Sequence, residues 1–186
     1  MRTIVAVTGA SGAAYAHSLL RHLQGDVELI ITRDAELVMR EELGLEPDAF
    51  RKLAAATYAS DDLGAPPASG SYRFDAMVIV PCSGTTVAKI AHGISDNLVT
   101  RAAAVCLKER RKLILVPRET PLSTIQLENL LKVAQAGAVV LPAMPGFYHR
   151  PQGVQDLVDF VVARILDHLG VEHSIEARWK GIDRGA

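Results

Sequence analysis

The chain has 186 residues, of which 49% are hydrophobic and 22% charged, and its formal net charge is -1. These values are typical of one soluble globular domain and exclude a chain that is disordered throughout. A nearly neutral chain also lacks the positive field that non-specific nucleic-acid binders use to neutralise phosphates. We therefore expect no nucleic-acid partner.

The cysteines and the N-terminus point to the reducing interior of the cell. Cys82 and Cys106 form no CxxC pair, and no histidines are spaced to complete a zinc site, so we expect no metal. The apolar run that begins at Thr3 ends before Gly9, which is shorter than a signal peptide or a membrane span requires. The sequence predicts a cytoplasmic protein with no membrane segment.

Apolar runs alternate with helical patterns along the chain. Runs rich in Val and Ile predict buried parallel strands at residues 3–7, 27–31, 77–80, 113–116 and 138–141. Apolar residues at three-to-four spacing predict helices at 13–23, 35–42, 98–109, 125–136 and 154–169. This alternation predicts a three-layer α/β sandwich with a doubly wound, Rossmann-like parallel sheet. We expect a single domain over residues 1–186, with a core at 1–170, a tail at 171–186 and a long loop at 61–71.

Small residues follow the first predicted strand in the order Thr8-Gly9-Ala10-Ser11-Gly12. At this place in an α/β fold, backbone N–H groups at a helix N-terminus bind phosphate. The spacing differs from a dinucleotide fingerprint and from a P-loop, so a mononucleotide is the favoured ligand. A tight turn that binds nothing remains the alternative.

A second polar turn follows the third predicted strand, from Ser83 to Thr86. The first and third strands of such sheets flank the crevice in which ligands bind, so the two turns together favour a ligand site. The hydroxyls of Ser83 and Thr85 serve equally well as helix N-caps, and both interpretations stay open. Cys82 is interpreted as a small buried hydrophobic residue, because no base lies beside it.

The fourth and fifth predicted strands end in charged and aromatic loops. Segment 117–121 holds Arg118 and Glu119 between two prolines. The guanidinium suits a phosphate or a flavin carbonyl and the carboxylate can exchange protons, whereas a surface ion pair is the alternative. Segment 142–151 gathers Tyr148 and other aromatic and basic residues, although only 5% of the chain is aromatic. That concentration favours ligand contact over simple packing.

A series of motifs resembles those of flavin prenyltransferases of the UbiX type. The motifs are TGASGA, PPASGS, PCS, LKERR followed by PRETP, PGFYHRP, and a helix that ends VARIL, and they run from about Thr3 to Trp179. The resemblance implies a metal-independent enzyme that joins a dimethylallyl group from dimethylallyl phosphate to N5 and C6 of reduced FMN. It also implies trimers gathered into a dodecamer, and a UbiD-type decarboxylase that receives the prenylated FMN for ubiquinone synthesis or aromatic-acid breakdown.

The resemblance assigns roles to individual residues. The flavin contacts that it implies are Gly9, Ala10, Ser11, Thr32, Ser83, Gly84, Thr85, Thr86 and Arg118. The contacts to the donor phosphate are Arg101, Lys108, Tyr148 and Arg164, with Trp179 beside the site. The residues with catalytic roles are Ser11, Glu42, Lys108, Glu119 and Tyr148. Among these, Ser11 is expected to hydrogen-bond near flavin N5, and Thr32 stands where the family usually has serine.

Two other functions are compatible with such a fold. FMN-dependent peptidyl-cysteine decarboxylases carry a proline-methionine-asparagine motif, whereas Pro145 is followed here by Gly146-Phe147-Tyr148. An FMN carrier without chemistry of its own would explain the glycine turns but not the basic residues Arg101, Lys108 and Arg164. We therefore favour the prenyltransferase.

Overall fold

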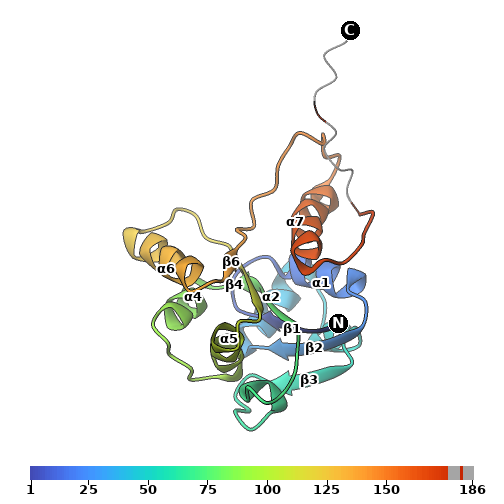
Figure 1. Cartoon of the computed structure of the whole chain (residues 1–186). Coiled ribbons are helices and arrows are strands. Elements are labelled where there is room, and N and C mark those ends of the chain that lie inside the picture. The colour runs from blue at the N-terminus through green and yellow to red at the C-terminus, as the bar shows by residue number, and fades with distance from the viewer. Residues whose placement is uncertain (176–180, 182–186) are drawn as a thin grey trace.

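The computed structural model of the chain describes residues 1–175 and 181, and its centre is a six-stranded sheet (Figure 1). The strand order is β3-β2-β1-β4-β5-β6, and every neighbouring pair is parallel. The strands are β1 Arg2–Val7, β2 Asp26–Ile31, β3 Ala56–Ala59, β4 Ala76–Cys82, β5 Lys112–Pro117 and β6 Val139–Val140. The predicted α/β class and parallel sheet are confirmed.

Helices cover both faces of the sheet and make the three layers (Figure 1). The helices of one face are α1 Ala13–His22, α2 Arg33–Leu43, α3 Pro47–Arg51 and α7 Val154–Leu169. Those of the other face are α4 Gly84–Ala91, α5 Leu98–Lys108 and α6 Thr124–Gln135. Residues of β1 alternate between the two cores, with Val5 packing on the α1 side and Ile4 on the α5 side. The sheet is therefore buried on both faces, which is why its strands read as continuous apolar runs.

β3 and α3 were not predicted from the sequence, and α4 was expected only through its N-cap at Ser83, without a range. β3 is an edge strand whose residues alternate between half-buried and exposed, so it carries no apolar run. α3 begins at Pro47 and is too short to show a helical period. The loop at 61–71 is confirmed apart from one 3-10 turn, η1, at Pro66–Ala68. In the described part of the chain no helix is both long and apolar enough to cross a membrane.

The order of the strands creates a crevice between β1 and β4. The chain proceeds from β1 through β2 to β3 on one side, and then returns to β4, β5 and β6 on the other. The hydroxyl of Thr8 ties the two ends together, because it donates to Pro81 O at 2.8 Å and accepts from Ser83 N at 2.8 Å. The predicted turns after β1 and β4 thus lie side by side at the carboxyl edge of the sheet, where such folds bind ligands.

Candidate functional site

Two side chains of opposite charge hold the peptide group between Ser11 and Gly12. The Arg118 Nε donates to the carbonyl oxygen of Ser11 at 3.4 Å. The Glu42 carboxylate accepts the N–H of Gly12 at 2.9 and 3.1 Å, and that of Ala13 at 2.8 Å. Gly12 has a φ of 122°, a conformation that favours glycine. The turn after β1 is therefore fixed from both sides, and the exposed Ser11 side chain projects from a rigid peptide.

This arrangement changes one expectation from the sequence. The first backbone N–H groups of α1 were expected to bind a phosphate, but those of Gly12 and Ala13 donate to the carboxylate of Glu42 instead. A carboxylate at a helix N-terminus satisfies the same unpaired donors and the same dipole that a phosphate would. In this structure the Glu42 carboxylate occupies these two donors.

The hydroxyls of Thr32 and Ser83 act as N-caps. Thr32 Oγ1 accepts from Ala35 N at 3.3 Å and opens α2. Ser83 Oγ accepts from Thr86 N at 3.2 Å and opens α4, and it lies 2.9 Å from Thr86 Oγ1. The N-cap interpretation of Ser83 is thus confirmed, while Thr85 is exposed on the first turn of α4.

Tyr15 belongs to the same cluster, although the sequence did not single it out. A Cβ atom on Gly12 would lie 2.8 Å from Tyr15 Cδ2 and 3.6 Å from Pro81 Cβ, so the ring packs against the turn. Burial, followed by the charge of Glu42, raises the pKa of the Tyr15 hydroxyl, and Arg118 opposes that shift. Its only sequence signal is an aromatic ring in the first turn of a helix that follows the glycine turn.

Arg118 and Glu119 form no ion pair with each other in the part of the chain that the structure describes. Glu119 Oε1 accepts from Thr120 N at 3.2 Å, and Oε2 accepts from Gln126 Nε2 at 3.3 Å. Both charged residues line a small cavity of about 20 Å³ between the ends of β4 and β5 and the helices α4 and α6. The surface ion-pair interpretation of this segment is therefore wrong.

The wall of the cavity is apolar apart from the two charged side chains and two amides, those of Gln126 and Asn129. Asn129 is 5% exposed, and its Oδ1 lies 3.1 Å from His92 Nε2. Cys82 also lines the cavity, and burial raises the pKa of its thiol, as expected for a small hydrophobic residue rather than a nucleophile. No pattern in the sequence indicated that Gln126 and Asn129 belong to this wall.

Arg101 and Lys108 both lie on α5, two turns apart near opposite ends of the helix. Arg101 Nε donates to Ala68 O at 2.9 Å, and a Cβ atom on Gly70 would lie 2.5 Å from Lys108 Nζ. Lys108 also pairs with Glu109, its side chain is 54% exposed, and it ends α5 shortly before β5 begins. It therefore lies at the amino edge of the sheet, opposite Ser11 and Arg118.

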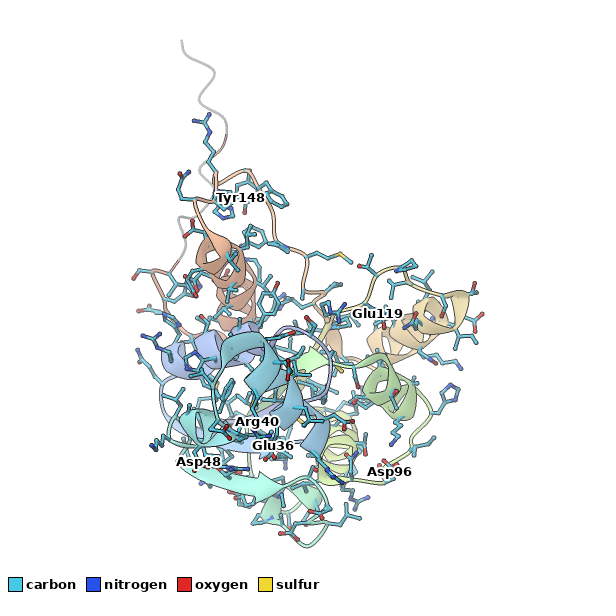
Figure 2. The ribbon with its side chains drawn as sticks, turned by 180° about the vertical axis from the view of Figure 1, so that it is seen from behind. Glu36, Arg40, Asp48, Asp96, Glu119 and Tyr148 are labelled. Carbon is cyan, nitrogen blue, oxygen red and sulfur yellow. The ribbon has the colours of Figure 1, made fainter. Side chains whose placement is uncertain are left out.

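Tyr148 and Arg164 meet around Phe160. The ring centroid of Tyr148 is 5.7 Å from that of Phe160, and the Arg164 guanidinium lies 5.8 Å from the same ring. Tyr148 stands on the loop that projects between β6 and α7, well apart from Glu119 (Figure 2). Trp179 lies outside the described residues.

One chain therefore holds its candidate residues in three groups. The flavin-side group is at the carboxyl edge, Arg101 and Lys108 lie on α5, and Tyr148 and Arg164 lie beside α7. Because α5 and α7 cover opposite faces of the sheet, the last two groups cannot meet within one protomer (Figure 1).

Comparisons with known proteins identify the family. A sequence profile of the Flavoprotein family matches residues 1–166. The flavin prenyltransferase UbiX of Thermoplasma acidophilum is 53% identical over 180 residues, which are 96% of this chain and 100% of that protein. The chain belongs to the UbiX-type flavin prenyltransferases. The family resemblance that was inferred from the sequence motifs is thus confirmed.

Two solved UbiX-like structures share the whole fold. A dodecameric FMN-dependent UbiX-like decarboxylase from Escherichia coli has a TM-score of 0.95 and 43% identity, covering 97% of this chain and 100% of that one. The structure of AnUbiX (PadA1) in complex with FMN and dimethylallyl pyrophosphate also has a TM-score of 0.95, with 42% identity and 98% coverage of both chains.

The groups at the carboxyl edge fit a flavin mononucleotide. Ser11 and Thr85 present exposed hydroxyls, and the only hydrogen bond of the Arg118 guanidinium in the described structure is the one to Ser11 O. Hydroxyl, guanidinium and helix N-terminal N–H groups are donors suited to flavin carbonyls and to a phosphate.

Proposed function

We propose that this UbiX-type protein joins a dimethylallyl group from dimethylallyl phosphate to N5 and C6 of reduced FMN. The observation that carries the proposal is the rigid turn at Ser11, held by Glu42 and Arg118, in a chain 53% identical to a flavin prenyltransferase. The relative that binds FMN and dimethylallyl pyrophosphate supports both ligand classes. We choose the monophosphate as donor on the strength of the family resemblance.

The carboxyl edge would bind and orient the flavin, which supplies the nucleophilic nitrogen and the ring carbon that take the two new bonds. Arg118 and the turn from Ser83 to Thr86 would contact it, and the Ser11 hydroxyl would hydrogen-bond near N5. Glu42 acts through the peptide that it holds. Glu119, on the wall of the adjacent cavity, would accept and return the protons that the second bond requires.

The basic residues would bind the phosphate of the donor. Arg101, Lys108 and Arg164, with a hydrogen bond from Tyr148, would stabilise the negative charge that grows as the phosphate leaves. Fixed donors in a site shielded from water are effective at this task, so we infer that no metal is needed. Trp179 is assigned to the same pocket by the resemblance alone.

These residues can act together only if different protomers contribute them. Lys108 and Arg164 lie on helices that cover opposite faces of one sheet. Met144 and Phe147, on the projecting loop, are 62% and 68% exposed, as expected for a surface that packs against another subunit. The dodecameric E. coli relative supports the same assembly, and we infer trimers gathered into a dodecamer.

The proposed product, prenylated FMN, indicates which class of enzyme would use it. Prenylated FMN would pass to a UbiD-type decarboxylase in the cytoplasm, for ubiquinone synthesis or for aromatic-acid breakdown.

One experiment separates the candidate functions. Purified protein is mixed without oxygen with reduced FMN and either dimethylallyl phosphate or the diphosphate, and the mass of the flavin is measured. A gain of one five-carbon unit supports the proposal and identifies the donor. An unmodified flavin, with carbon dioxide released from a peptidyl-cysteine substrate, would instead identify a cysteine decarboxylase, and no reaction in either assay would leave a carrier.

A further inference from the structure

Gln126 connects the start of α6 to the carboxylate of Glu119. Its Oε1 accepts from Ser123 N at 2.9 Å, and its backbone N–H donates to Ser123 Oγ at 3.3 Å. These two bonds form a capping box, which fixes the rotamer of the glutamine. The other end of the amide, Nε2, donates to Glu119 Oε2 at 3.3 Å. One side chain thus caps the N-terminus of α6 and also holds the Glu119 carboxylate.

The neighbouring elements confine this amide. A Cβ atom on Gly84, the first residue of α4, would lie 3.1 Å from Gln126 Nε2, so a larger residue there would press on the amide. Gln126, Gly84 and Glu119 all line the small cavity of about 20 Å³. The donor is therefore held between two helices and directed at the carboxylate.

The backbone alone would not fix Glu119 in this way. Among the described residues, its other oxygen, Oε1, accepts only from Thr120 N, at 3.2 Å, and Glu119 is an exposed side chain. An exposed glutamate bonded through one oxygen keeps its rotational freedom, whereas a bond to each oxygen fixes the plane of the carboxylate. The Gln126 amide supplies the second bond.

We propose that Gln126 is a positioning residue for the reaction, which holds the Glu119 carboxylate in the orientation needed for proton transfer at the cavity wall. This inference rests on the proposed function of Glu119. A capping box requires only the Oε1 end of the glutamine, so the role of Nε2 is separable from helix capping.

The variants separate these two roles. Gln126→Met removes the donor at similar length, and Gln126→Glu keeps an acceptor for Ser123 N but places a second carboxylate against Glu119. Ser123→Ala weakens the cap without removing the donor. Gln135→Met makes the same change at the exposed end of α6. Each is measured for turnover at saturating substrates, FMN affinity and melting temperature, and Gln126→Met is repeated in a Glu119→Gln background.

We expect Gln126→Met to lower turnover roughly threefold to tenfold, the range for one hydrogen bond to a partly solvated charged group, and to leave FMN affinity within about twofold. Gln126→Glu should lower turnover at least as much, while both controls keep it. In the Glu119→Gln background Gln126→Met should have no further effect. An equal loss in Ser123→Ala, or an undiminished loss in the Glu119→Gln background, would overturn the inference.

A second measurement needs no reaction. Infrared spectra of protein labelled with carbon-13 glutamate, differenced against Glu119→Gln, isolate the carboxylate stretch of Glu119. Gln126→Met should shift that band and Gln135→Met should not. An unshifted band refutes the contact whatever the activity, whereas a shifted band in a protein that makes no prenylated flavin would refute the proposed function alone.

Discussion

Replacing Glu42 by alanine tests whether the turn at Ser11 is held from outside. The change leaves the N–H groups of Gly12 and Ala13 without the carboxylate that accepts them at 2.8 to 3.1 Å. Loss of a side-chain cap at a helix N-terminus costs about 1 kcal/mol, and loss of a negative charge there up to about 1 kcal/mol more. Glu42 is exposed, so solvent screens its charge. We expect the free energy of unfolding to fall by about 1 to 2 kcal/mol in total.

The matched control is Glu41→Ala, which removes the same charge from the preceding exposed position of α2. Thermal unfolding without ligand should show Glu42→Ala melting roughly 2 to 8 °C below wild type, with Glu41→Ala close to wild type. FMN affinity should fall only in Glu42→Ala, because the peptide that carries Ser11 is then free to turn. If the two variants have equal melting temperatures and equal FMN affinities, Glu42 does not hold the turn.

Three further predictions follow from packing, ionisation and assembly. Gly9→Ala would place a Cβ atom 2.6 Å from Asp34 Cβ, so chemical denaturation should show a loss of about 1 to 3 kcal/mol. Burial raises the pKa of the Cys106 thiol from 9.0 to about 12, so the stability that it contributes is present below pH 9 and is lost as the pH rises toward 12. Urea unfolding at about pH 8 and pH 10 should show that loss, with a smaller one in Cys106→Ala. Oligomers of Ser11→Ala or of Lys108→Gln alone should be inactive, but mixed oligomers should regain activity, and no recovery would contradict a site shared between protomers.

The sequence predicted those elements whose burial leaves a pattern in the chain. The strands at the centre of the sheet are apolar without interruption because helices cover both faces, and α7 was predicted with its observed bounds. β3 was missed because an edge strand of four residues, half exposed, has no apolar run. Of the predicted last strand, Val139 and Val140 form β6, and Leu141 N still donates to Leu115 O of β5 at 2.8 Å.

Parts of the flavin-side site could also be predicted. The carboxyl ends of parallel strands must meet at one edge, so the turns that hold Ser11, Ser83 and Arg118 were expected to converge. The partners of those turns could not be predicted. Glu42 reaches Gly12 from the end of another helix, and the glutamine of a capping box carries no sign of which carboxylate its free end will meet. Such contacts depend on how helices pack across loops, which residue spacing does not encode.

The residues expected to bind the donor phosphate cannot be brought together within one chain. A three-layer fold separates α5 from α7 by the thickness of the sheet, so adjusting loops cannot bring Lys108 to Arg164. A rotation that relates protomers can do so, since it places one face of the first chain against the other face of the second. If the basic residues share one phosphate, the activity is a property of the interface. Dissociating the assembly should then abolish transfer while each protomer keeps its folded sheet.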